Sequence, residues 1–390
     1  MQALGRQEKG GLWSTAAAAI GGWIPVRPRW GFAPCSWLGV AAAALLASPP
    51  GCAVNPVPTP QSAANGASDS PLGGGATAAD AATVTEKDVS AVGFADVGGD
   101  AGSDAAPVPV TLATLEATAT DAAISGGTHL LAWAPAVSDS GRLVVVVPDL
   151  LRAPTDYTQL AMAAARLGHR VLVLALAQTG DLAKLCAGSD ACSEAARLEQ
   201  FDGQDHTAVV AVSAADGLVN RLVKALALRA KAQPGERWGD FYSGAVPKWS
   251  QIAVVGHGDG AGEAAIIGIK QNAWRILLLA GPRDGQGDTP AIWLSGQHAT
   301  PTANWRAFAH TKTANWARIV AAWTALGLGS GASAVSVDGA QTPGIAVQLL
   351  TTTMDVPDPA AGVAVDAALP SEPVALGHLQ SAWKVLFWPF

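Results

Sequence analysis

The sequence predicts an α/β protein built on a doubly wound, mostly parallel sheet. Short runs that are apolar throughout alternate with longer segments of helical spacing; these runs are at 143–147, 171–175, 252–255, 276–280 and 345–350. Strands that are buried on both faces have this uniformly apolar character, and strands separated by helices are typical of parallel connections. The chain after position 107 is long enough for one such domain.

The helices between these strands are predicted from apolar residues three and four positions apart. A helix over 156–167 ends before Gly168, and a long helix over 206–231 places Ala215, Leu218, Leu222 and Leu226 on one face. We expect three further helices, at 260–270, 314–326 and 379–387.

Composition and charge argue against two classes of function. The 390 residues include 24 Lys+Arg and 31 Asp+Glu, so the formal charge is −7, and charged residues make up 14% of the chain. Because no basic stripe is available to neutralise phosphates, we expect no nucleic-acid partner. No apolar run reaches the ~18 residues of a spanning helix, which argues against a polytopic membrane protein.

The N-terminal region predicts export to the bacterial cell envelope. A basic stretch at 26–30 precedes an apolar run at 37–47, and small residues follow, which is the pattern of a secretory signal. Cys52 after Gly51 resembles a lipobox, in which the thiol carries a lipid that would be the contact with the membrane. Ordinary cleavage after Ala53 is the alternative. The expected location is therefore the periplasm, the outer membrane as a lipoprotein, or the medium.

Three regions are predicted along the chain: an export segment at 1–52, a linker at 53–107 and a folded domain at 108–390. The linker has almost no bulky apolar side chain, so it cannot offset its ordering entropy and is expected to be disordered. Cys186 and Cys192 are spaced for a disulfide-closed loop, which export permits, and two free thiols are the alternative. No other Cys or His stands nearby in the sequence, so we expect no zinc site.

The sharpest local pattern is IAVVGHGDGAGEAA at 252–265. A buried strand runs into a glycine-rich turn and then directly into a helix, which is the layout of a nucleophile elbow, G-x-S-x-G. Gly256 and Gly260 hold the two glycine positions, where the strand and helix backbones pass too close for a Cβ. The nucleophile position holds Gly258, which has no side chain that can attack a substrate.

With this elbow and the order of strands and loops around it, the chain resembles the α/β-hydrolases over about residues 127–390, and within them bacterial secreted esterase- or lipase-like members. The resemblance implies one oxyanion donor at the backbone N–H of Asp259 and another from the loop of Asp149, Leu150 and Leu151. It also implies an acid after the penultimate strand, near 311–313, and a histidine after the last strand, near 354–362. The sequence has neither residue there, and the nearest histidine is His378.

Other residues near the elbow have two interpretations each. His257 is expected to be a structural or pocket-rim histidine, with a catalytic base as the alternative. Asp284 and Asp288 follow a strand; we expect solvated loop carboxylates, with a displaced catalytic acid as the alternative. Ser295 lies near His298 and is a weaker candidate for a replacement nucleophile. Five tryptophans form either a glycan- or lipid-facing platform or, as we expect, part of the core: Trp274, Trp293, Trp305, Trp316 and Trp323.

The sequence thus predicts an exported hydrolase-fold protein that is catalytically inactive or impaired and keeps a pocket for a small ester, a lipid or a glycan. An active esterase- or lipase-like hydrolase with relocated catalytic residues is the alternative. A second alternative is dinucleotide binding, because VVGHGDGA also fits G-x-G-x-x-A. That fold requires an acidic residue about 20 positions further on, where this chain has Ile276. We therefore expect no cofactor.

Overall fold

The structure is a computed structural model. It describes the backbone of Val84–Val89 and the residues 108–177, 179–187, 189–339, 343–344, 346–354, 369–370 and 379–388. The predictions for the export segment, for Cys52 and for His378 lie outside the described residues, as does most of the predicted linker. None of the helices in these ranges combines the length and apolarity needed to cross a bilayer.

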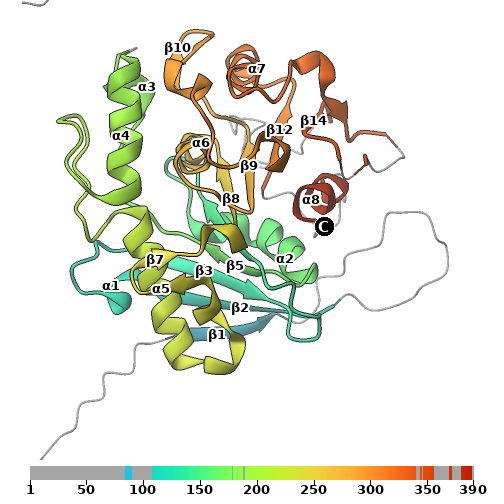
Figure 1. The fold of residues 1–390 in the computed structure, drawn as a ribbon. Coiled ribbons are helices and arrows are strands. Elements are labelled where there is room, and N and C mark those ends of the chain that lie inside the picture. Colours follow the sequence, from blue (N-terminus) through green and yellow to red (C-terminus); the bar gives the residue numbers. More distant parts are fainter. Residues whose placement is uncertain are drawn as a thin grey trace, which may run out of the picture. The chain divides into compact units, whose positions relative to one another are not determined.

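One large sheet forms the centre of the domain (Figure 1). Its parallel part consists of β4 (Leu143–Val147), β5 (Arg170–Val173), β8 (Ile252–His257), β9 (Arg275–Leu279), β12 (Trp305–His310), β13 (Val335–Ser336) and β14 (Leu349–Thr352). Three antiparallel strands extend one edge: β1 (Val84–Val89), β2 (Val110–Glu116) and β3 (Thr128–Trp133). The predicted parallel sheet is confirmed.

The order of the strands creates a switch point at β4. Among the described residues the order is β1-β2-β3-β5-β4-β8-β9-β12-β14-β13. The chain leaves β4 for β5 on one side and returns to the other side of β4 as β8. Ligands of open α/β sheets bind beyond the carboxyl ends of the strands at such a reversal. The segments that follow Val147 and His257 therefore meet at the position where a site is expected.

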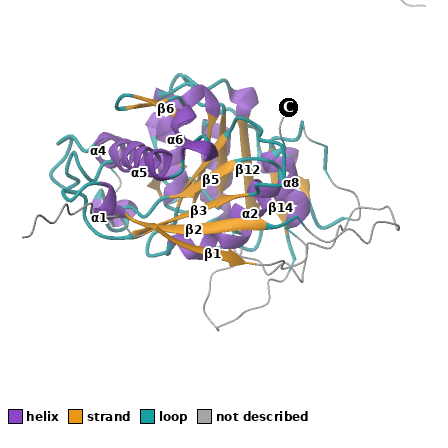
Figure 2. Cartoon of the chain, turned by 90° about the horizontal axis from the view of Figure 1, so that it is seen from below, coloured by secondary structure: helices purple, strands orange, loops and turns teal. Residues whose placement is uncertain are grey.

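Helices cover both faces of this sheet (Figure 2). Side chains of α5 (Leu218–Ala232), α6 (Gly260–Lys270) and α7 (Trp316–Ala325) belong to one core cluster, and those of α2 (Thr158–Arg166) and α8 (Gln380–Phe387) to the other. Val145 of β4 packs in the first cluster and Val146 in the second. This is why the central strands are apolar at every position. The shorter elements are α1 (Ala117–Thr120), α3 (Leu182–Leu185), β6 (Tyr242–Ser243), β7 (Val246–Pro247), β10 (Gly285–Gln286) and β11 (Thr289–Pro290).

The prediction of one long helix over 206–231 is wrong in its first half, because α5 begins only at Leu218. The preceding segment wraps around a carboxylate instead. Glu199 accepts hydrogen bonds from the backbone N–H groups of His206, Thr207 and Val212, at 3.0–3.1 Å. Because these backbone N–H groups donate to Glu199, they do not donate to backbone carbonyl groups as they would in a helix. Glu199 lies on α4 (Asp190–Asp202), a helix that the apolar spacing did not reveal.

Two further boundaries differ from the predictions. The last predicted strand, at 345–350, is β14 and lies later, at Leu349–Thr352. Part of the predicted linker forms β1, which pairs antiparallel with β2 from Val84↔Leu115 to Val89↔Val110. Edge pairing uses backbone hydrogen bonds, so a polar sequence with three β-branched residues, VTEKDV, is compatible with it.

The five tryptophans pack mainly in the core, as expected. Trp305 and Trp323 are fully buried, and Trp293 is 7% exposed. Trp274 and Trp316 are half-buried. The buried indole rings contribute to the cluster under α6 and α7.

Candidate functional site

The turn between β8 and α6 has the geometry of a strand-to-helix corner. β8 ends at His257 and α6 begins at Gly260. Gly258 between them has φ +56°, which favours glycine, and its N–H donates to the carbonyl of Leu279 over 2.8 Å. A Cβ at Gly256 would collide with the backbone of Gly260, and a Cβ at Gly260 would collide with the backbone of Val147 and Pro148 at the end of β4. The close approach predicted for these two glycines is therefore present.

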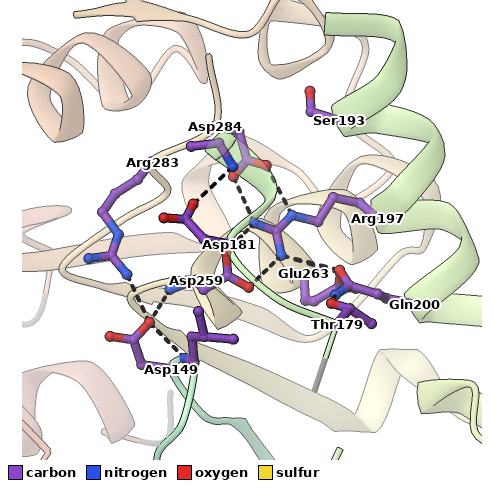
Figure 3. A network of polar contacts seen from close by, with 12 residues as sticks. Asp149, Thr179, Asp181, Ser193, Arg197, Gln200, Asp259, Glu263, Arg283 and Asp284 are labelled. Atoms are coloured by element: carbon purple, nitrogen blue, oxygen red, sulfur yellow. Dashed lines mark hydrogen bonds and ion pairs between the residues drawn. The ribbon is translucent and has the colours of Figure 1, made fainter. Parts of the chain in front are cut away.

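The carboxylate of Asp149 lies in this corner (Figure 3). Its Oδ1 atom accepts hydrogen bonds from the backbone N–H of Leu150 at 2.9 Å and from that of Asp259 at 2.6 Å. Arg283 adds a third donor, Nη2, at 2.8 Å. A Cβ at Gly258 would collide with the carbon and both oxygens of this carboxylate. The space for a side chain at position 258 is thus filled by Asp149.

The resemblance predicts that two backbone N–H groups bind the oxyanion of a substrate. In the structure, the N–H groups of Leu150 and Asp259 both donate to an oxygen atom of the protein, Oδ1 of Asp149. The loop after β4 supplies its donor through Leu150, and it also supplies the acceptor. Leu151 is 82% exposed, its φ is +63°, and it does not line the cavities of about 40 and 330 Å³ that border Asp149.

A buried tyrosine and histidine support the loop from behind. The N–H of Asp149 donates to the hydroxyl oxygen of Tyr157 over 2.7 Å, and this oxygen lies 3.0 Å from Nδ1 of His257. The direction of this second hydrogen bond is set by the tautomer of His257. Both side chains are fully buried, and burial raises the pKa of the Tyr157 hydroxyl. The structure places His257 behind the turn, and its side chain does not line the cavities of about 40 and 330 Å³ that border Asp149.

A buried arginine, which the sequence did not reveal, joins three acidic side chains next to the turn (Figure 3). Arg197 of α4 binds both carboxylate oxygens of Asp259, at 2.9 and 3.0 Å. Its Nε lies 3.0 Å from Asp284, and its Nη1 lies 3.5 Å from Glu263. The expectation of a solvated Asp284 is wrong: its side chain is 2% exposed because Arg197 compensates its charge. Asp288 is exposed, as expected.

Burial controls the protonation of this cluster. It raises the pKa of Glu263 to about 8, an effect that Arg197 opposes and that the charges of Asp259 and Asp284 increase. Burial also raises the pKa of Asp284, again against Arg197. Glu263 therefore holds a proton at neutral pH. Its Oε2 atom is buried and has no hydrogen-bond partner among the described residues.

Two cavities meet at this cluster. The larger has a volume of about 330 Å³ and a charged lining: Asp149, Leu150, Asp181, Ala183, Arg197, Asp259, Arg283, Asp284, Asn315 and Arg318. The smaller has a volume of about 40 Å³ and lies between the ends of β4 and β5, the helix α4 and the start of α6. Asp149, Leu150 and Asp259 line both. Within the described ranges, no three His, Cys, Asp or Glu residues are grouped to hold a metal ion.

The remaining sequence candidates, Ser295 and His298, lie elsewhere, and so does the end of the strand after which the resemblance places an acid. β12 ends at His310, whose Nε2 lies 2.7 Å from the carbonyl oxygen of Met354 and whose Nδ1 accepts from the N–H of Lys312. Ser295 is exposed at the end of a short 3₁₀ helix, and the ring of His298 packs on Trp305 at 4.9 Å. None of these residues lines either cavity. The resemblance places a histidine within 354–362. Residues 355–362 of this segment lie outside the described residues.

The predicted disulfide between Cys186 and Cys192 is confirmed. It joins the end of α3 to the first turn of α4, with a Cα–Cα distance of 5.5 Å. The helix α4 carries Arg197, and the residue before α3, Asp181, lines the larger cavity. The disulfide therefore closes a loop beside the site.

Comparisons with known proteins add little to this picture. Neither a scan with protein-family models nor a search of curated proteins gives a match. Among solved structures, an S-formylglutathione hydrolase from Agrobacterium tumefaciens aligns with 46% of this chain and 60% of its own length, at 11% identity and a TM-score of 0.28. The aligned region thus spans about three fifths of that enzyme. The strand order, the covering helices and the strand-to-helix corner fit an α/β-hydrolase fold.

Proposed function

We propose that this chain is a hydrolase-fold protein that binds a ligand without acyl-transfer catalysis, because Asp149 occupies its oxyanion site. The observation that carries the proposal is the contact set of Asp149 Oδ1. The N–H groups of Leu150 and Asp259 both donate to this one oxygen, in the corner where Gly258 supplies no nucleophile.

Acyl transfer needs a nucleophile, a base within hydrogen-bond reach and free donors for the developing oxyanion. A negative carboxylate in the oxyanion position repels the charge that a tetrahedral intermediate would develop there. To move it away, three hydrogen bonds to a charged acceptor must break, each worth roughly 1.5–3 kcal/mol. Loss of the nucleophile alone typically costs about six orders of magnitude in rate.

A binding role is supported by the cavities at the switch point. They lie where open α/β sheets hold ligands, and Asp149 forms part of both walls. The larger cavity is lined mostly by charged side chains. This lining favours a polar ligand, such as a glycan or a small ester, over a lipid. The alternative of relocated catalytic residues receives no support from Ser295, which is exposed and lines neither cavity.

The experiment is an activity test on the purified full chain. A fluorophosphonate probe for serine hydrolases and a panel of short p-nitrophenyl esters are applied to the wild type and to Gly258→Ser, with an unrelated active esterase as the positive control. We expect no labelling and no turnover above the buffer blank for either protein. Labelling or turnover of the wild type would overturn the proposal, and substantial turnover of Gly258→Ser would show that a base and open oxyanion donors are present.

We also propose that the protein is exported. The apolar run at 37–47 followed by Cys52 supports this, and so does the disulfide, since disulfides persist in oxidising compartments. Fractionation of bacteria that express the full chain tests the proposal. We expect the protein in the envelope fraction, with release from membranes in Cys52→Ala. Recovery of the wild type in the cytosol with reduced cysteines would contradict it.

A further inference from the structure

Two acceptor atoms near the turn have no donor among the described residues. The three donors to Asp149 all reach Oδ1, so Oδ2 is left without a hydrogen-bond partner. Oε2 of Glu263 is also without a partner, and this side chain is only 3% exposed. Bulk water therefore does not satisfy Glu263, and a buried polar atom that is left without a hydrogen-bond partner is costly.

Both residues line the smaller cavity. Four acidic side chains contribute to its wall, and none of the described residues that line it is basic; the acidic ones are Asp149, Asp216, Asp259 and Glu263. Asp216 is already satisfied by Ser213 and Arg221. The volume of about 40 Å³ is sufficient for about three water molecules, or for one small polar group with a short stem.

The charges around this cavity are not balanced. The single guanidinium of Arg197 faces Asp259, Asp284 and Glu263. A second guanidinium, Arg283, is paired with Asp149. Even with Glu263 protonated, the cluster keeps an excess negative charge in a half-enclosed space, where electrostatic interactions are strong. A cation is the complementary ligand.

The arrangement favours a cation that donates hydrogen bonds. A metal ion needs several ligands that converge at short distance, and no group of three acidic, His or Cys residues in the described part of the chain does so. An ammonium group instead offers three N–H donors that point in different directions. Such a group suits acidic residues that are spread over the cavity wall, as Asp149 and Glu263 are.

We propose that the smaller cavity binds the primary ammonium group of a small amine, with Glu263 and Asp149 as its acceptors. The inference rests on the proposed function, since it treats the corner as a binding site. The aliphatic stem of the amine packs against Leu150, Leu176 and Val212, which line the same cavity. Leu150 also lines the larger cavity, so the rest of the ligand extends there.

Binding of an ammonium group should depend on pH through Glu263. The groups that face this side chain are Arg197, Asp259 and Asp284, and burial raises its pKa to about 8. An ammonium ion binds the ionised form of the carboxylate. Below the pKa of Glu263, binding therefore requires that this side chain release its proton. The affinity is therefore expected to increase from pH 6 to pH 9, below the ordinary pKa of an amine.

The test is calorimetric titration of the full chain with n-butylamine and 1,4-diaminobutane at constant ionic strength. Butanol, tetramethylammonium and KCl are titrated in parallel, because each lacks either the charge or the N–H donors. We expect the two amines to bind at least tenfold more tightly at pH 9 than at pH 6, and the three other compounds to bind at least tenfold more weakly than the amines. No binding of the amines at millimolar concentration, or equal binding of butanol or K⁺, would overturn the inference.

A pair of variants identifies the site. Glu263→Gln keeps the shape of the side chain and removes its charge, so it should lose at least tenfold in amine affinity and lose the pH dependence. Glu194→Gln, at an exposed ion pair on the neighbouring helix, should bind like the wild type. Unchanged affinity in Glu263→Gln would overturn the assignment. If the amines fail to bind while the wild type stays unlabelled by the esterase probe, this inference fails and the proposed function stands; labelling of the wild type overturns the proposed function whatever the titration shows.

Discussion

The carboxylate of Asp149 fills the space that a side chain at Gly258 would need. The two residues are far apart in sequence, but they follow β4 and β8, which are parallel neighbours paired from Leu143↔Ile252 to Val147↔Gly256. The pairing brings the ends of both strands to one point. The carboxylate of Asp149 therefore accepts from the backbone of the turn and lies where the side chain of a nucleophile would be.

A methyl group at position 258 should destabilise the fold by crowding. In Gly258→Ala the added Cβ collides with Asp149, so we expect a loss of about 2–4 kcal/mol in the free energy of unfolding, from the strained φ and the displaced carboxylate together. Urea denaturation measures it. The matched control is Gly244→Ala, because Gly244 has φ +59° and open space around its Cβ position. Equal losses in the two variants would show that the backbone conformation alone matters and that Asp149 does not fill the corner.

The buried guanidinium of Arg197 should contribute strongly to stability. Replacement by Gln leaves the buried carboxylate of Asp284 and the partly buried one of Asp259 without this countercharge, and it removes the contact with Glu263; loss of one partner of a buried pair typically costs about 3–5 kcal/mol. The control is Lys184→Gln, since Lys184 pairs with Asp181 on the surface and such pairs are worth about 0–1 kcal/mol. Both losses are obtained from urea denaturation at pH 7. A loss below about 1 kcal/mol in Arg197→Gln would contradict the compensation that we infer for the buried acids.

The raised pKa of Glu263 predicts a definite pH dependence of stability. The folded state holds the proton up to about pH 8, whereas the ordinary pKa is 4.5. The contribution of Glu263 is therefore largest below pH 4.5 and is lost as the pH rises to 8. Glu263→Gln lacks this loss, so between pH 5 and pH 8 its free energy of unfolding should improve relative to the wild type by roughly 2–4 kcal/mol. Denaturation at both pH values tests this, and a constant difference would show that Glu263 is ionised in the fold.

The disulfide should stabilise the segment that carries Arg197. Closure of the short loop between Cys186 and Cys192 is worth about 2 kcal/mol in the chain-entropy estimate. We expect dithiothreitol to lower the thermal midpoint of the wild type and to leave a Cys186→Ser, Cys192→Ser double variant unchanged. A double variant with the midpoint of the oxidised wild type would show that the bond adds nothing to stability.

The parts of the fold that local sequence determines were predictable. The parallel strands are apolar at each position because helices cover both faces, and α6 follows the glycine turn at the predicted residues. The antiparallel β2 and β3 were missed because Thr, His and Glu interrupt their apolar residues. The start of α5 could not be predicted, because it depends on Glu199, a carboxylate on a helix that was itself missed.

The candidate site was predictable only in its backbone. The glycines reveal a tight corner, whereas the contacts that fill it join distant residues. Asp149 bonds to Asp259 across 110 positions, and Arg197 bonds to Asp284 across 87. No local spacing encodes such pairs, since they exist only after the sheet has aligned its strands. One signal was visible: Glu263 is the one carboxylate in the otherwise apolar first turns of α6.

The position of the Asp149 carboxylate is the most direct test of this account. A high-resolution crystal structure of the wild-type chain gives the distances from its Oδ1 to the backbone nitrogens of Leu150 and Asp259. We predict that both distances are about 3 Å or less and that no water lies between the two N–H groups. A water or another ligand oxygen held by these two N–H groups, with the side chain of Asp149 turned away, would contradict the claim that the protein occupies its own oxyanion site.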